Sequence, residues 1–126
     1  MTQLMAKARI AAKSAHALLA LGDTNGAVNR AYYAMFGASK AALAHIDEQL
    51  AVAKTHATII RRFGQHVVVD HNLDRSIGRH LNSTEELRIA ADYDSNSVDA
   101  SVAQAVLGRM DDFIAIIEQF LSGTSK

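Results

Sequence analysis

The stretch of residues 23–46 constrains the fold most, because apolar or small side chains surround it almost completely at about 3.6 residues per helical turn. A helix this apolar cannot lie on a protein surface, so we expect it to be the central helix around which the others pack. Its bulky face comprises Val28, Tyr32, Met35, Ala42, Leu43 and Ile46, and its smooth face comprises Ala27, Ala34, Gly37, Ala38 and Ala41.

Two residues on the smooth face need compensation from their surroundings. Gly37 costs roughly 0.8–1 kcal/mol in a helix interior relative to Ala, so we expect a neighbouring helix to approach it closely. Arg30 lies in the middle of the same face and is flanked by Tyr33. Because burial of an unpaired guanidinium is prohibitively costly, Arg30 needs a carboxylate, a phosphate or a cluster of polar partners.

Length and composition predict one helical domain over residues 1–121 and a disordered tail over residues 122–126. The chain of 126 residues has no Pro and no Cys, and the lack of thiols is compatible with a reducing cytoplasm. No run approaches the roughly 20 apolar residues of a membrane span. The 13 basic and 13 acidic residues cancel, which argues against a general electrostatic grip on nucleic acid but leaves a local basic patch open.

Apolar spacing predicts an all-α fold built of several helices. The expected helices cover residues 2–21, 23–46, 56–68 and 70–82, followed by a helix from residue 84 to a break at 94–96 and a last helix after Ser97. Residues 48–54 form a connector, and residues 67–69 are helix or loop rather than a strand. Gly22 ends the first helix, and the expected N-caps are Asp23 or Thr24, Thr55 and Ser97.

Ser83 followed three residues later by Glu86 has the pattern of a capping box. In that pattern the serine hydroxyl and the glutamate carboxylate each accept a hydrogen bond from a free backbone N–H at a helix start. We therefore expect a new helix to begin at Thr84 and the helix before it to end near Asn82.

Four segments together resemble the small, stand-alone HEPN-domain proteins (higher eukaryotes and prokaryotes nucleotide-binding). They read NRAYYAMF, KTH, GRHLN and ELRIAADYD, and they span the chain from its second helix to its penultimate one. The resemblance implies an up-and-down four-helix bundle with one or two extra short helices, usually present as a homodimer. It also implies a role related to RNA or nucleotides, of which two kinds are known in this family.

RNA cleavage is the first role that the resemblance implies. Many HEPN ribonucleases carry an arginine, four to six further residues and then a histidine, with a polar residue just after the arginine. Metal-free cleavage needs a base near the ribose 2′-hydroxyl and a cation on the phosphate, which His and Arg supply at neutral pH. Arg75, Ser76 and His80 match this pattern, although Arg and His are also common on exposed helix flanks.

The segment from Arg88 to Tyr93 resembles the functional helix of the family more closely, but Asp92 and Tyr93 stand where the histidine is expected. His56, at the start of the third expected helix, could supply the imidazole, which makes Arg88 and His56 a second candidate pair. Alternatively, Arg30, His56, Arg88, Asp92 and Tyr93 form a buried polar network that only joins three helices. In both cases Asp92 is the natural counter-ion for Arg30 or Arg88.

Partnership with a minimal nucleotidyltransferase, in a toxin–antitoxin or defence module, is the second role that the resemblance implies. In this role Arg30 and Tyr33 contribute phosphate contacts and base stacking, whereas Tyr32 and Phe36 belong to the core. We favour such a binding or partner role over catalysis. Neither a cofactor nor a metal site is expected, because no histidine pair has a convincing metal-ligand spacing.

Overall fold

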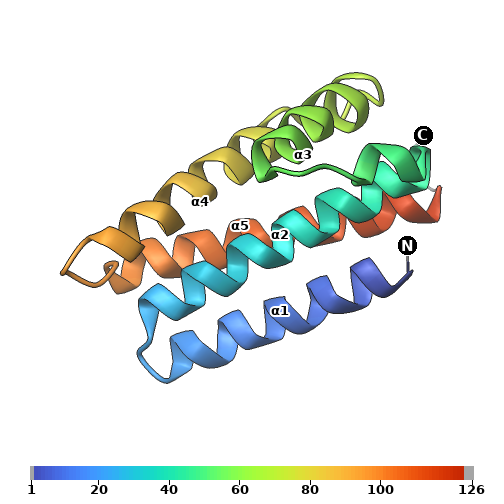
Figure 1. Cartoon of the computed structure of the whole chain (residues 1–126). Helices are drawn as coiled ribbons and strands as arrows, with labels where there is room; N and C mark the ends of the chain where they lie inside the picture. Colours follow the sequence, from blue (N-terminus) through green and yellow to red (C-terminus); the bar gives the residue numbers. More distant parts are fainter. Residues whose placement is uncertain (1, 124–126) are drawn as a thin grey trace.

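The computed structural model describes residues 2–123, and Figure 1 shows its long helices lying side by side. The helices are α1 (Thr2–Ala20), α2 (Thr24–Ile46), α3 (His56–Arg62), α4 (Ser76–Tyr93) and α5 (Ala100–Ser122), with a short 3₁₀ helix η1 (Glu48–Ala51) and a π-helix η2 (Phe63–Val69). No strand is present in this part of the chain. The fold is therefore all-α, as the sequence predicts: α1, α2, α4 and α5 form the bundle, and α3 packs against α2 and α4.

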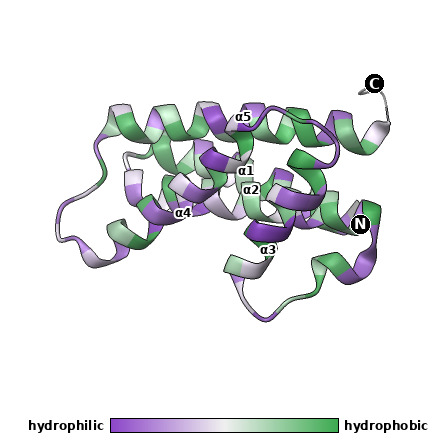
Figure 2. Ribbon diagram, turned by 90° about the horizontal axis from the view of Figure 1, so that it is seen from above, coloured by the Kyte–Doolittle hydropathy of each residue, from purple (hydrophilic) through white to green (hydrophobic). Residues whose placement is uncertain are grey.

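Helix α2 is the centre of the bundle and packs against α1, α4 and α5. Its buried residues occur all round the helix and include Ala27, Val28, Ala31, Tyr32, Ala34, Met35, Phe36, Ala38, Ser39, Ala41, Ala42 and Leu43. Figure 2 shows hydrophobic and hydrophilic residues alternating along the helices, as expected for helices with one buried face. The predicted central helix is thus confirmed, except that Ile46, assigned to its bulky face, is 39% exposed at the last turn.

Gly37 lies at a close contact between α2 and α1. A Cβ atom built on Gly37 would lie 3.5 Å from the Cβ of Ala8 and 3.8 Å from the carbonyl oxygen of Leu4. These are ordinary van der Waals distances for one extra methyl group, but they leave no room for a longer side chain. The close helix contact expected at Gly37 is confirmed.

Two of the expected helix caps are formed. Asp23 accepts a hydrogen bond from the backbone N–H of Gly26 at 2.8 Å, and Thr55 accepts one from that of Thr58 at 3.2 Å. Gly22 lies in the turn that follows α1, and its φ of 87° is a left-handed conformation that favours glycine. The turn between α1 and α2 and the start of α3 therefore follow from local sequence.

The predicted helix break at Ser83 is wrong, because α4 runs without interruption from Ser76 to Tyr93. The Ser83 hydroxyl donates to the carbonyl oxygen of His80 at 3.2 Å, a bond that a serine inside a helix can make. Ile77, Leu81 and Thr84 form one buried face that crosses the expected break. This continuous packing outweighs the capping-box pattern.

The last helix also begins and ends differently from the prediction. Asp99, rather than Ser97, occupies the N-cap position of α5, and its carboxylate accepts from the hydroxyl of Ser101 at 2.6 Å. Helix α5 extends to Ser122, inside the expected tail, and Gly123 follows in a left-handed conformation. The rest of that tail, residues 124–126, lies outside the described residues.

Residues 67–69, which the sequence leaves between helix and loop, are helical. They belong to the π-helix η2, where Val67 and Val68 are buried and the N–H of Asp70 reaches the carbonyl oxygen of Gln65 at 3.1 Å. Across residues 2–123, no helix combines the length and the apolar character needed to cross a membrane.

Replacing Gly37 with Leu should destabilise the protein by about 1–3 kcal/mol, because the side chain would have to push α1 away from α2. Gly37→Ala is the matched control and should leave stability unchanged or raise it by up to about 1 kcal/mol, since one methyl group fits and helix propensity improves. Urea denaturation followed by circular dichroism measures both effects. Equal stability of the Leu variant and the wild type would show that α1 and α2 are not in close contact at Gly37.

Candidate functional site

The hydroxyl group of Tyr32 joins three helices at one polar point. The Tyr32 side chain projects from α2 and is fully buried, yet its oxygen lies 2.9 Å from Nδ1 of His56 on α3 and 3.2 Å from Oε2 of Glu85 on α4. We call Tyr32, His56, Glu85 and Arg88 the Tyr32 cluster. The expectation that Tyr32 belongs to the core therefore describes only its ring, because its hydroxyl is part of a polar site.

The direction of these hydrogen bonds follows from the chemistry of the groups. An ionised carboxylate can only accept, so the Tyr32 hydroxyl donates to Glu85. Nδ1 of His56 must then donate its hydrogen to the Tyr32 oxygen, which leaves Nε2 as the nitrogen with a lone pair when the ring is neutral. Burial, and next the negative charge of Glu85, raise the pKa of Tyr32 far above its usual value, so the phenol keeps its proton.

Aromatic rings hold the imidazole of His56 in place. The Phe36 ring stacks on it with a centroid distance of 4.1 Å, and the Tyr33 ring meets it edge-on at 5.9 Å. The side chain is partly exposed. His56 thus has one nitrogen fixed by Tyr32 and its ring plane fixed by Phe36.

Arg88 is mostly buried and incompletely paired. Its guanidinium carbon lies 4.8 Å from the centre of the Tyr32 ring and 5.6 Å from that of Tyr33, and only 16% of its side chain is exposed. The nearest carboxylate oxygen, from Asp92, is 3.6 Å away, which is longer than a hydrogen bond, and Asp92 itself is half exposed. The buried Nε atom has no hydrogen-bond partner. Arg88 therefore retains donors that could bind an anion.

Arg30 contacts the ring of Tyr33, which Arg88 also contacts. Its guanidinium carbon lies 5.4 Å from the centre of the Tyr33 ring, so that ring contacts both Arg30 and Arg88. With Lys7 and Ser14, Arg30 also lines a hollow of about 420 Å³ between α1 and α2. Of the two arginines for which Asp92 is the expected counter-ion, Arg88 is the one that it pairs with. Within the described chain, Arg30 forms no ion pair with Asp92 and lies against the ring of Tyr33.

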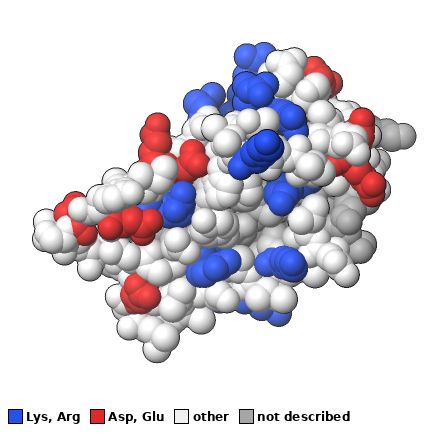
Figure 3. All heavy atoms as spheres, in the orientation of Figure 1, with Lys and Arg blue, Asp and Glu red and all other residues white. Residues whose placement is uncertain are grey.

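These contacts connect into one group of side chains that we call the cation–aromatic strip, in which the rings of Tyr32 and Phe36 are buried and the other members reach the surface. Lys40 extends it beyond His56, since its amino group lies 5.9 Å from the centre of the Phe36 ring. Figure 3 shows basic side chains spread over the face made by α1, α2 and α4, with acidic side chains mainly toward its edges. The strip comprises Lys7, Arg30, Tyr33, Arg88, Tyr32, His56, Phe36 and Lys40.

Arg75 and His80 do not form one site. Arg75 is the N-cap residue of α4, and His80 lies five positions further along the chain, so at about 100° per residue the two side chains leave the helix axis about 140° apart. Arg75 is exposed at the start of α4, whereas His80 faces α5, and burial together with the nearby cation of Arg109 lowers the pKa of His80. The literal match to the ribonuclease pattern is therefore split between two surfaces.

Tyr93, another residue expected at the site, does not reach it. It lies at the end of α4 and is 88% exposed. Glu85, in contrast, is a residue that the sequence reasoning missed. The sequence could have indicated it, because Glu85 and Arg88 are three positions apart and lie on one face of a helix. The capping-box interpretation assigned a role to Glu86 instead.

A comparison with protein-family models shows to which family the chain belongs. The HEPN domain model matches residues 1–120. The chain belongs to the HEPN family. It is 34% identical over 97 residues to the UPF0332 protein glr0978 of Gloeobacter violaceus, covering 75% of each chain.

A second relative of this HEPN protein is the candidate toxin MJ0605 of Methanocaldococcus jannaschii. The two are 32% identical over 95 residues, which cover 75% of this chain and 69% of the relative. No solved structure matches the chain significantly. Among the described side chains, no group of three or more His, Asp or Glu could hold a metal ion.

Alkaline pH should destabilise the protein in a Tyr32-dependent way. The pKa of Tyr32 is raised in the folded protein, so above about pH 10 the unfolded chain loses this proton first and the free energy of unfolding falls. Tyr32→Phe should cost about 1–3 kcal/mol at pH 8, because His56 and Glu85 lose their shared partner, and the loss should shrink as the pH rises above 10.

Urea denaturation at a series of pH values between 8 and 11 measures this dependence. Tyr93→Phe is the matched control, since this side chain is 88% exposed at the end of α4 and its replacement should leave the profile unchanged. If the Tyr32→Phe variant and the wild type lose stability in parallel above pH 10, the Tyr32 hydroxyl is not buried between His56 and Glu85.

Proposed function

We propose that this HEPN protein binds single-stranded RNA or nucleotides along the cation–aromatic strip. The observation that carries the proposal is Arg88, a guanidinium with a 16% exposed side chain, no hydrogen-bond partner for Nε, and only a distant contact to Asp92. A structural ion pair would satisfy these donors, whereas a phosphate could accept two of them at once. The site is thus better suited to an anionic ligand than to packing alone.

The rest of the strip supplies the other contacts that a single strand needs. Arg30, Lys7 and Lys40 extend the positive charge to both sides of Arg88, and the partly exposed ring of Tyr33 offers a surface for a base. Stacking of a base on an aromatic side chain is worth roughly 1–3 kcal/mol and tolerates any sequence. The zero net charge of the chain is compatible with this mode, because the attraction is local.

Arg88→Gln should weaken RNA binding about tenfold or more, because it removes the positive charge and the bidentate donors. Fluorescence anisotropy with a labelled oligoribonucleotide of mixed sequence measures the Kd, and raising the salt concentration should weaken wild-type binding more than binding by the variant. Arg75→Gln is the matched control and should change the Kd less than twofold, since Arg75 is exposed and lies outside the strip. Absence of wild-type binding, together with a large loss of stability in Arg88→Gln, would mean that the network is only structural.

A second candidate function, metal-independent RNA cleavage, rests on the chain of hydrogen bonds from Glu85 through Tyr32 to His56. This chain fixes the tautomer in which Nε2 of His56 can accept a proton. The imidazole of His56 would take the proton of a ribose 2′-hydroxyl while the 2′-oxygen attacks the adjacent phosphorus. The bond between phosphorus and the 5′-oxygen breaks, the leaving oxygen takes up a proton from water, and Arg88 stabilises the charge on the phosphate.

Incubation of labelled RNA with purified protein in EDTA tests this second function. If it is correct, His56→Gln abolishes cleavage while retaining RNA binding within about threefold, and His80→Gln cleaves normally. Loss of cleavage in His80→Gln alone would assign the reaction to Arg75 and His80. No cleavage by the wild type, with binding intact, leaves the strip as a binding surface only.

We further propose that the protein acts in the cytoplasm as a homodimer, as a toxin-type component paired with a minimal nucleotidyltransferase. Membership of the HEPN family and the similarity to a candidate toxin support this role. Light scattering after size exclusion tests the dimer, and a neighbouring gene for a nucleotidyltransferase, co-purifying with this chain, would support the partnership. A monomer that co-purifies with no such enzyme would contradict it.

A further inference from the structure

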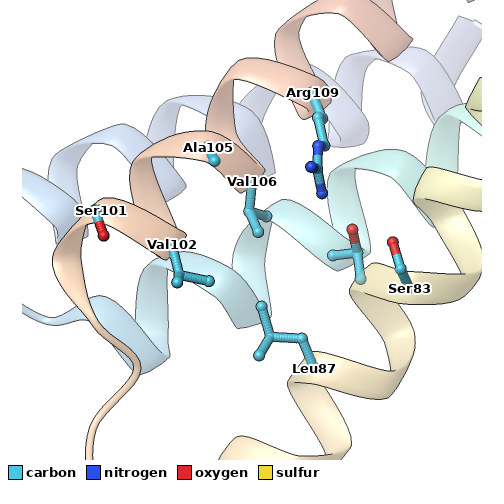
Figure 4. Close-up of a pocket in the computed structure, with 8 residues that line it drawn as sticks. Ser83, Leu87, Ser101, Val102, Ala105, Val106 and Arg109 are labelled. Atoms are coloured by element: carbon cyan, nitrogen blue, oxygen red, sulfur yellow. The ribbon is translucent and has the colours of Figure 1, made fainter.

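Helices α4 and α5 leave a hollow between them, because α4 packs mainly against α2 and touches α5 much less. The hollow has a volume of about 370 Å³, within the range of small-molecule sites in proteins. Figure 4 shows its lining side chains converging from the two helices. They are Ser83, Thr84, Leu87, Ser101, Val102, Ala105, Val106 and Arg109, none of which belongs to the cation–aromatic strip.

Thr84 presents a buried hydroxyl group without a partner at the wall of this hollow. The residue is only 1% exposed, and its Oγ1 atom forms no hydrogen bond. A threonine inside a helix usually returns its hydroxyl hydrogen to a carbonyl of the preceding turn, as the neighbouring Ser83 does toward His80. Because an unpaired buried hydroxyl is costly, the Thr84 oxygen is an indication of a polar ligand.

Arg109 supplies a positive charge at the same end of the hollow. Its guanidinium extends from α5 toward Ser83 (Figure 4), and it forms no ion pair with any described residue. The hydroxyls of Ser83 and Ser101 already donate to His80 and Asp99, respectively. The donors that remain for a ligand are therefore the Thr84 hydroxyl and the guanidinium of Arg109, a pair suited to an anionic oxygen.

The remaining wall is apolar. Leu87 from α4 and Val102 from α5 line the part of the hollow away from Arg109, Val106 lies between them and Arg109, and Val102 is 42% exposed. A ligand body placed there would cover this side chain and remove apolar surface from water, which favours binding. The hollow thus joins an anion-binding end to an apolar wall.

We propose that the hollow between α4 and α5 binds a small organic anion, a carboxylate or phosphate attached to an apolar body. The anionic group contacts Arg109 and the Thr84 hydroxyl, and the apolar body lies against Leu87, Val102 and Val106. The site is independent of the proposed RNA-binding strip, because the two share no residue.

Titration with phenyl phosphate and with benzoate, followed by amide chemical shifts and calorimetry, tests the proposal and identifies the preferred anion. At least one of the two should bind with a Kd below about 1 mM and shift amides near Thr84 and Arg109. Inorganic phosphate should bind at least tenfold more weakly than phenyl phosphate if the latter is preferred, and phenol should bind at least tenfold more weakly than either anion. Failure of both aromatic anions to bind, or shifts confined to other regions, would overturn the proposal.

Two variants separate binding by these residues from nonspecific attraction. Thr84→Val keeps the shape of the side chain but removes the hydroxyl, and it should weaken the preferred probe about three- to tenfold. Arg109→Gln should weaken it tenfold or more, whereas Lys13→Gln, which removes an exposed charge on α1, should have no effect. An unchanged Kd in Thr84→Val, with the fold intact by circular dichroism, would contradict the role of the buried hydroxyl. Both variants should bind RNA like the wild type, so failure here is distinguishable from failure of the RNA-binding proposal.

Discussion

The shared hydroxyl group of Tyr32 is the interaction on which the candidate site depends. It is supplied by the central helix and satisfies one polar group from α3 and one from α4 at the same point. The ring beneath that hydroxyl carries the guanidinium of Arg88. One buried tyrosine therefore contacts the imidazole of His56, the carboxylate of Glu85 and the guanidinium of Arg88, which lie on helices other than its own.

The apolar character of α2 explains why the Tyr32 hydroxyl is needed. A helix that is buried on nearly every side offers its neighbours little but apolar surface, as at Gly37, where α1 approaches closely. Polar side chains that point toward it, such as His56 and Glu85, would lose water without a partner. The Tyr32 oxygen provides that partner and also makes the contact between α2, α3 and α4 specific, because a shifted packing would leave three groups unpaired.

The sequence predicted well those features that depend on local pattern. The central helix, its turn at Gly22 and the caps at Asp23 and Thr55 follow from periodicity and from side chains that bond to nearby backbone. The capping-box pattern at Ser83 failed because tertiary burial of one continuous face kept α4 intact. A local capping pattern therefore determines a helix boundary less strongly than a buried face that continues past it.

The residues of the candidate site were predictable in part. Sequence reasoning selected His56 and Arg88, and the structure brings both against Tyr32. It placed Tyr33 beside Arg30 but left open whether Asp92 pairs with Arg30 or Arg88, and the structure pairs it with Arg88. The sequence could not decide this, because the direction in which a side chain leaves a helix depends on how that helix is rotated against its neighbours.

Ultraviolet cross-linking of the protein to a 4-thiouridine oligoribonucleotide, followed by peptide mapping, is the most direct test of the account. We expect adducts in the peptides that carry Tyr33 and His56, and their yield should fall when Arg88 is replaced by Gln. Adducts confined to other peptides, such as those of α5, would place the ligand elsewhere and contradict the assignment of the strip.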